Sequence, residues 1–224
     1  MFLNNKAAVY LYKYRFEFLL IALLLLIFDK IFFTDNAFYL KYVWLSNMVI
    51  ITIASYGIYT ESSKKVKLVR NIFSLIAIAL PFAFMFLGYS LLFLQILTRF
   101  LVLYYCFIFI VVMRQITVVK EVRVNVIIGT FCGYMILSMI ALFTYLFIHI
   151  NYPGSFHGVN ANNPMLAYSD LSYFSFVTLT SIGFGDIYPV TDMSRLTVSF
   201  FGMLGQFYMA AVVGIIISRF TSRN

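Results

Sequence analysis

Charged residues are scarce in this chain. Asp, Glu, Lys and Arg make up only 11% of its 224 residues, whereas a soluble globular domain contains about 25%. Apolar residues make up 63%. The composition excludes an ordinary soluble domain and predicts an integral membrane protein.

Residues that carry redox or metal chemistry are also few. The chain has two cysteines and two histidines. Cys106 and Cys132 each lie inside an apolar run, where we expect them to act as small hydrophobes. The apolar runs show no paired carboxylates, no nucleophile beside a base and no His/Cys spacing of a metal site. This pattern argues against the hypothesis of a transmembrane enzyme. We expect neither catalysis nor a cofactor.

The formal net charge of +8 could suggest a nucleic-acid partner, but its distribution favours a membrane one. The basic residues cluster at the ends of apolar runs, as loop charges do in membrane proteins. With the N-terminus inside, Lys30, Lys41 and Arg195 fall outside and Arg99 falls within the membrane. Twelve fall on the cytoplasmic side: Lys6, Lys13, Arg15, Lys64, Lys65, Lys67, Arg70, Arg114, Lys120, Arg123, Arg219 and Arg223. We therefore expect both termini in the cytoplasm.

Six apolar runs are long enough for membrane-spanning helices, which need about 20 residues each. They cover residues 16–33, 42–59, 71–87, 90–113, 124–150 and 196–218. The boundary between the third and fourth runs falls at Gly88 and Tyr89, where glycine permits a tight turn, or alternatively near residues 95–98. A seventh run, 171–182, is too short to span.

The stretch "LTSIGFGDIYP", residues 179–189, follows this short run on the outer side. Non-helical backbone at membrane depth survives only where it is buried in protein or lines a watery cavity. Glycine tolerates positive φ angles, so Gly183 and Gly185 can alternate with Ile182 and Phe184 to form a column of carbonyls. Ser181 can add a hydroxyl at its inner end. Rings of such carbonyls can replace the water shell of a cation, so the sequence predicts a re-entrant loop that lines a pore.

The longer string "FSFVTLTSIGFGDIYP" resembles the pore loop of potassium channels, whose signature reads T-x-G-Y-G or T-x-G-F-G, commonly followed by Asp. The resemblance covers residues 170–218, and its helix-loop-helix topology extends back to residue 124. The first four runs match such channels only in number and orientation. The resemblance implies an all-α homotetramer around a central pore, with a sensor-like domain at residues 1–120 and a pore domain at residues 121–224.

The resemblance also implies roles for individual residues. Potassium would bind to oxygens of Ser181, Ile182, Gly183 and Phe184. The loop would be supported by Thr180, Gly185 and Asp186, the last as a hydrogen-bonding brace. Residues 170–179 would form a pore helix with Asp170 at its N-terminus, where a carboxylate is favoured. Gly205 would be a gating hinge, or would only permit close helix packing.

Two positions depart from the commoner pattern of these channels. Ser181 replaces threonine and loses a methyl group, and Phe184 replaces tyrosine and loses a phenol that could tie the loop to its helix. These departures leave two alternatives open. One is a weakly selective monovalent cation channel, and the other is a non-conducting pore-like modulatory subunit.

Voltage sensing requires several charges on one helix, because one elementary charge gains only about 2.3 kcal/mol per 100 mV. The fourth run offers Arg99 and then nothing basic until Arg114, so we expect at most weak voltage dependence. Under the alternative boundary Arg99 would merely reach the outer surface. The stimulus that opens the pore is not encoded in any motif of the chain, and a regulatory protein is one option. The compact loops suit a bacterial cytoplasmic membrane, where the lipid bilayer, potassium ions and other copies of the chain would be the partners.

Overall fold

The structure, a computed structural model, describes residues 10–33, 38–59, 64–87, 90–118, 124–161 and 163–221. These residues are mostly helical. The elements are α2 (Arg15–Phe28), η1 (Asp29–Ile31), the π-helix η2 (Tyr39–Val43), α4 (Trp44–Tyr56), η3 (Gly57–Tyr59), α5 (Lys64–Leu87), α6 (Leu91–Val118), α7 (Val124–Asn151), β1 (Phe156–His157), α8 (Pro164–Leu179), β2 (Tyr188–Pro189), α9 (Asp192–Phe207), the π-helix η4 (Tyr208–Val213) and α10 (Gly214–Thr221).

Three helices of the described part are long and apolar enough to cross a membrane. They are α6, α7 and the continuous helix Asp192–Thr221, which joins α9, η4 and α10 and is called the C-terminal helix below. The first three predicted spans are also helical, in α2, α4 and α5. However, α2 and α4 are short, and α5 opens with Lys64, Lys65, Lys67 and Arg70. Three spans are therefore supported by length and composition, and the full set of six stays a prediction.

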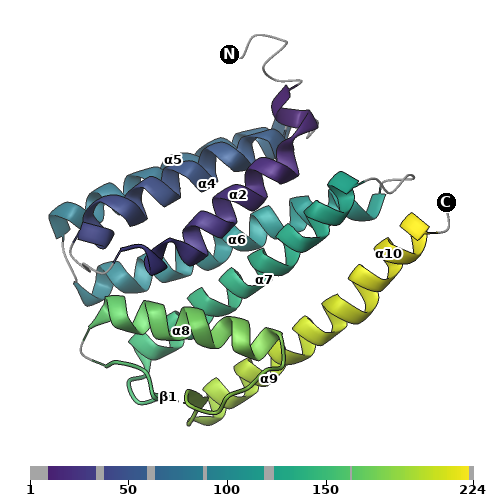
Figure 1. Cartoon of the computed structure of the whole chain (residues 1–224). Coiled ribbons are helices and arrows are strands. Elements are labelled where there is room, and N and C mark those ends of the chain that lie inside the picture. The colour runs from purple at the N-terminus through teal and green to yellow at the C-terminus, as the bar shows by residue number, and fades with distance from the viewer. Residues whose placement is uncertain are drawn as a thin grey trace.

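The long helices run side by side, with α8 and the two-stranded antiparallel sheet of β1 and β2 at one end (Figure 1). The start of α2 and the end of α10 lie together at the opposite end. The placement of both termini in the cytoplasm stays a prediction. The division at residue 120 stays a prediction, because α6 and α7, on either side of it, pack along one another.

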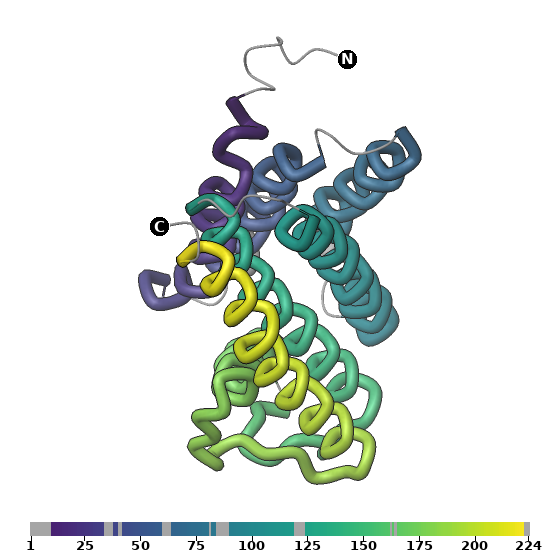
Figure 2. The backbone as a smooth tube through the Cα atoms, turned by 90° about the vertical axis from the view of Figure 1, so that its right-hand side faces the viewer, coloured from purple at the N-terminus to yellow at the C-terminus, as the bar shows by residue number. Residues whose placement is uncertain are grey.

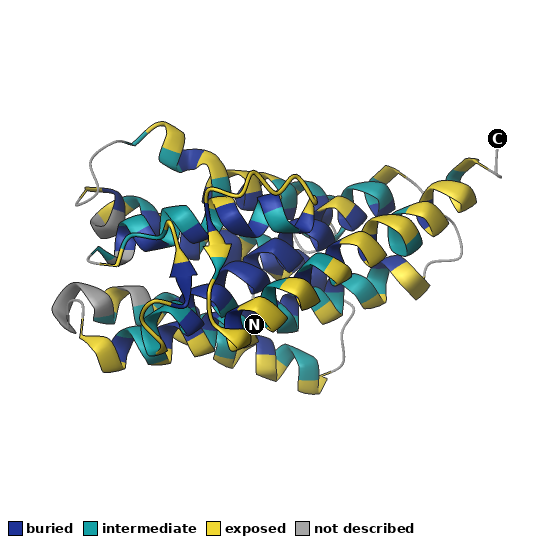
Figure 3. Ribbon diagram, turned by 90° about the horizontal axis from the view of Figure 1, so that it is seen from below, coloured by how far each residue is buried: buried dark blue, intermediate teal, exposed yellow. Residues whose placement is uncertain are grey.

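Helix α7 is the centre of the molecule. It packs against α2, α6, α8 and α9. In its most apolar stretch, 83% of the residues are buried. The C-terminal helix lies alongside α7 (Figure 2), but only 22% of the residues in its most apolar stretch are buried. Its outward face is largely exposed (Figure 3). One chain alone therefore leaves most of this apolar helix uncovered.

The boundary between the third and fourth predicted spans falls where Gly88 and Tyr89 placed it. Helix α5 ends at Leu87 and α6 begins at Leu91, while residues 88 and 89 lie outside the described part. The alternative boundary near residues 95–98 is wrong, because the Thr98 hydroxyl donates to the Leu94 carbonyl at 2.9 Å inside a regular helix. Arg99 thus lies about 12 Å along α6, at 1.5 Å per residue.

A buried carboxylate joins the N-terminal helices. Asp29 is 6% exposed, and its two oxygens accept hydrogen bonds from the Tyr39 hydroxyl at 2.9 Å and from the Asn47 amide at 2.5 Å. A buried charge is tolerated only when its polar atoms are paired. The sequence alone does not indicate this burial, because both donors come from other elements, Tyr39 from η2 and Asn47 from α4.

Candidate functional site

Helix α8 is the predicted pore helix, but it begins earlier than expected. Asn163 is its N-cap and accepts hydrogen bonds from the backbone N–H groups of Met165 at 2.9 Å and Leu166 at 3.4 Å. Pro164 occupies the first helical position, where its fixed φ and missing N–H are tolerated. Asn followed by Pro is thus the start signal that sequence reasoning passed over.

The prediction that Asp170 starts the pore helix is wrong. Asp170 lies at about the end of the second turn of α8, counting 3.6 residues per turn from Pro164. Its carboxylate accepts a hydrogen bond from the Asn160 backbone N–H at 3.0 Å. Asp170 therefore fastens the preceding outer loop to the body of α8.

The backbone leaves the helical path directly after α8. Thr180 closes the helix, since its N–H and hydroxyl both donate to the Phe176 carbonyl, at 2.9 and 2.7 Å. The Ile182 N–H then donates to the Val177 carbonyl at 3.0 Å. Residues 180–186 lie within the stretch 179–189 that the sequence predicted to line a pore. We call residues 180–186 the filter loop.

Positive φ angles alternate along the filter loop, at Ser181 (60°), Gly183 (55°) and Gly185 (82°). The prediction that both glycines adopt such angles is confirmed. The positive φ of Ser181 was not predicted. A left-handed conformation costs a residue with a side chain about 1–2 kcal/mol. A Cβ placed on either glycine would meet nothing within 4 Å. Backbone conformation, and not crowding within the chain, explains these glycines.

The outer part of the loop is held from behind by Tyr173 of α8. Its hydroxyl donates a hydrogen bond to the Asp186 carboxylate at 3.1 Å. Its ring lies parallel to that of Phe184, with centroids 6.3 Å apart and planes 7° apart. Asp186 thus has the brace partner expected of it. Tyr173 was missed from the sequence, and it places a phenol behind Phe184, which has none.

The antiparallel pair of β1 and β2 anchors the outer end of the loop. Phe156 pairs with Pro189 and His157 pairs with Tyr188, whose rings stack with centroids 4.6 Å apart. The Ser155 carbonyl accepts from the Val190 N–H at 2.9 Å and from the Ser194 hydroxyl at 2.8 Å. Both ends of the filter loop are therefore attached to neighbouring structure.

Gly205 lies where the C-terminal helix crosses the end of α8. A Cβ at Gly205 would lie 2.6 Å from the Leu179 carbonyl oxygen and 3.0 Å from its Cα. This contact supports the packing alternative for Gly205 over a hinge. The departure from α-helical geometry begins a few residues later, in the π-helix η4, and π-helical turns occur frequently at functional sites.

Tyr208, the first residue of η4, connects the C-terminal helix to α7. Its hydroxyl donates to the Thr130 carbonyl at 2.8 Å. A Cβ on Gly133 of α7 would collide with that hydroxyl. Gly133 therefore makes the room that lets Tyr208 reach the backbone of α7.

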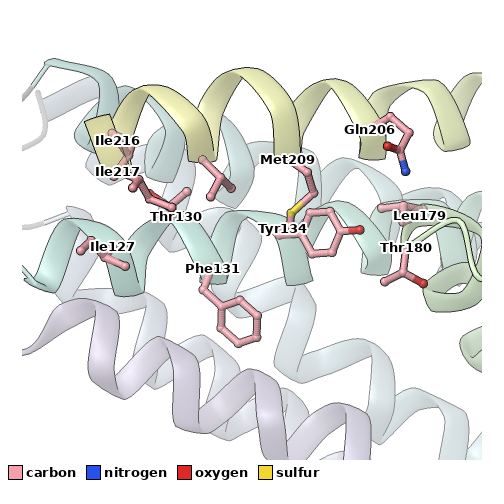
Figure 4. Close-up of a pocket in the computed structure, with 11 residues that line it drawn as sticks. Ile127, Thr130, Phe131, Tyr134, Leu179, Thr180, Gln206, Met209, Ile216 and Ile217 are labelled. Atoms are coloured by element: carbon pink, nitrogen blue, oxygen red, sulfur yellow. The ribbon is translucent and has the colours of Figure 1, made fainter. Parts of the chain in front are cut away.

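A cavity of about 560 Å³ is lined by residues of α7, the end of α8 and the C-terminal helix, next to the filter loop. Figure 4 shows Ile127, Ile216 and Ile217 at one end, Tyr134 and Met209 in the middle, and the polar side chains of Thr180 and Gln206 at the filter end. The cavity leads from the inner end of the loop along the C-terminal helix toward the side of the molecule that carries both described chain ends.

Arg99 is not among the residues that line the cavity. Its side chain is exposed, and its guanidinium lies 5.0 Å from the centroid of the Phe147 ring of α7. Such a contact is a weak cation–π interaction at an exposed site. No further basic residue lies between Arg99 and Arg114 on α6.

Comparison with known proteins supports the class that this geometry indicates. Residues 129–222 match the family model described as "Ion channel", a stretch that includes most of α7, all of α8 with the filter loop, and the C-terminal helix. No curated protein and no solved structure gives a significant match. The matched part is therefore similar to an ion-channel domain, and this similarity supports an ion channel of the pore-loop type.

Proposed function

We propose that the chain forms a potassium-selective channel that conducts passively. The observation that carries this proposal is the filter loop itself. Ser181, Ile182, Gly183, Phe184 and Gly185 follow a helix end, with positive φ at alternate positions. Potassium would bind to the backbone carbonyls of residues 181–184 and to the Ser181 hydroxyl. Ions would then pass between adjacent sites by mutual repulsion.

Four copies of the chain surround the pore in this proposal, because one loop supplies only one side of each carbonyl ring. The exposure of the C-terminal helix supports this assembly. Leu196, Met203 and Phe207 are 73, 62 and 64% exposed, although the helix is apolar enough to span a membrane. In a tetramer such side chains could pack against neighbouring copies or line the pore.

Helix α8 assists the ion electrostatically. Its C-terminal end, at Leu179 and Thr180, carries the negative end of the helix dipole and lies next to the cavity that contains Gln206. A cation below the filter loop is stabilised by that partial charge. Thr180, Gly185 and Asp186 act as supports of the loop and not as ion ligands.

The proposed membrane arrangement has six spans with both termini in the cytoplasm, in a cell membrane of bacterial type. Asp29, paired with Tyr39 and Asn47, belongs to the sensor-like part. Because Arg99 is the single basic residue in the membrane portion of α6, the channel does not open steeply with voltage. No nucleic acid takes part.

The test is potassium and sodium flux into liposomes that contain the wild type or Gly183→Asp. The variant places a side chain and a charge in the carbonyl column and should abolish flux. Gly154→Asp is the matched control, because Gly154 also has a positive φ of 84° and no atom within 4 Å of an added Cβ, but lies in the outer loop. Valinomycin gives the total capacity of the vesicles.

Three results distinguish the proposal from its alternatives. Potassium flux far above sodium flux, lost only in Gly183→Asp, supports a selective filter. Similar fluxes of both ions favour the weakly selective cation channel. A folded wild-type tetramer that passes neither ion contradicts the proposal and favours the non-conducting subunit.

A further inference from the structure

The inner end of the filter loop is linked to the C-terminal helix by one pair of side chains. The Gln206 amide Nε2 donates a hydrogen bond to the Ser181 hydroxyl oxygen. The Ser181 backbone N–H donates to the Thr178 carbonyl at 3.1 Å. Ser181, in its uncommon left-handed conformation, is thus held through both its backbone and its side chain.

The position of Gln206 follows from the glycine before it. Gly205 lets the C-terminal helix approach the backbone of Leu179 more closely than any residue with a Cβ could. This brings Gln206 within reach of the loop that leaves α8. In Figure 4 the Gln206 amide extends from α9 toward the end of α8, where Leu179 and Thr180 lie.

Serine at position 181 creates a need for such support. A β-branched residue at positive φ is a steric outlier, so serine supplies a hydroxyl at φ 60° where threonine would be strained. Serine lacks the second Cβ substituent that stiffens χ1 in threonine. Its hydroxyl is therefore free to rotate unless another group fixes it.

We infer that Gln206 is a positioning residue of the inner ion site, and that its hydrogen bond to Ser181 fixes the hydroxyl oxygen that faces the ion. A serine oxygen has two acceptor lone pairs. When the Gln206 amide occupies one of them, the other is held in a single direction and is available to a cation. The inference rests on the proposed function and adds a selectivity determinant outside the filter loop.

The experiment measures the ratio of potassium to sodium flux in liposomes that contain the full chain. The variants are Gln206→Leu, Ser181→Ala and the double variant. Each single change should lower the ratio about fivefold, which corresponds to the loss of one hydrogen bond. The double variant should lower it no further than Ser181→Ala alone, because without the hydroxyl the Gln206 amide has no ion ligand to position.

Two further variants separate the contact from general effects. Gln206→Asn keeps an amide in the cavity but is one methylene shorter, so it should lower the ratio as Gln206→Leu does. Ser199→Ala removes a hydroxyl that donates to the Arg195 carbonyl at 2.8 Å within the same helix and should leave the ratio unchanged. A merely structural role of Gln206 would reduce the yield of tetramer without changing the flux ratio of the tetramers that form.

The outcomes also separate this inference from the proposed function. A conducting wild type with an unchanged ratio in Gln206→Leu overturns the inference and leaves the channel standing. The same holds if Gln206→Asn retains the wild-type ratio, or if the double variant shows the product of the single effects. A wild type that passes no ions overturns the proposed function, and this inference with it.

Discussion

The Tyr173 hydroxyl donates a 3.1 Å hydrogen bond to the carboxylate of Asp186. This bond joins α8 to the outer end of the filter loop, while the parallel rings of Tyr173 and Phe184 join the same two elements slightly further in. The loop is therefore supported from the side that faces away from the proposed ion path.

Replacing Tyr173 by Phe removes the hydrogen bond and keeps the ring. Because the stacking of the ring on Phe184 remains and only the bond to Asp186 is lost, we expect the tetramer to assemble and potassium flux to decay several-fold faster during sustained conduction. Single-channel open times in planar bilayers would measure the decay. Tyr188→Phe, in β2, is the control. Equal decay in both variants would argue against a role for the Tyr173–Asp186 bond.

Two glycines on the same helix provide a matched pair. A Cβ on Gly205 would lie 2.6 Å from the Leu179 carbonyl oxygen, whereas a Cβ on Gly202 would make an ordinary contact of 3.8 Å with Thr178. We expect Gly205→Ala to destabilise the protein by about 1–3 kcal/mol through overpacking. Gly202→Ala should be neutral or stabilising, because alanine favours helix.

Thermal unfolding in detergent would compare these two alanine variants. Similar melting temperatures for both would show that Gly205 is not in contact with α8 as described. A loss of gating in Gly205→Ala with unchanged stability would instead favour the hinge.

Tyr208 and Gly133 should be energetically coupled. Gly133→Ala places a methyl group against the Tyr208 hydroxyl and should cost about 1–3 kcal/mol of stability. Tyr208→Phe removes the hydrogen bond to Thr130 and should cost about 1 kcal/mol. Since the phenylalanine lacks the oxygen that collides, the double variant should lose less than the sum of the two. Strict additivity in a double-mutant cycle would contradict the proposed contact.

Local chemistry explains what the sequence revealed about the site. Gly183 and Gly185 signalled positive φ because only the missing Cβ makes it inexpensive, and the structure has both. Hydrophobic length also located α6, α7 and the C-terminal helix.

What the sequence did not reveal depends on partners distant along the chain. Asp29 is buried because Asn47 and Tyr39 donate to it from another helix. Gln206 gains its partner twenty-five positions earlier only because α9 crosses the end of α8. The start of α8 is different, since the Asn163 and Pro164 signal was local. It was overlooked because Asp170 also suits a helix N-terminus.

The π-helix η4 changes the angular phase of everything that follows it. A segment that holds about one extra residue within an otherwise α-helical rod turns α10 by about 100° relative to its position in an unbroken α-helix. Deleting one residue between Tyr208 and Val213 would remove this offset and rotate the faces of Ile215, Ile216 and Ile217. The one extra residue therefore determines which side of the last two turns is exposed and which is buried. A helical wheel drawn through residues 192–221 assumes an unbroken α-helix and would assign these sides incorrectly.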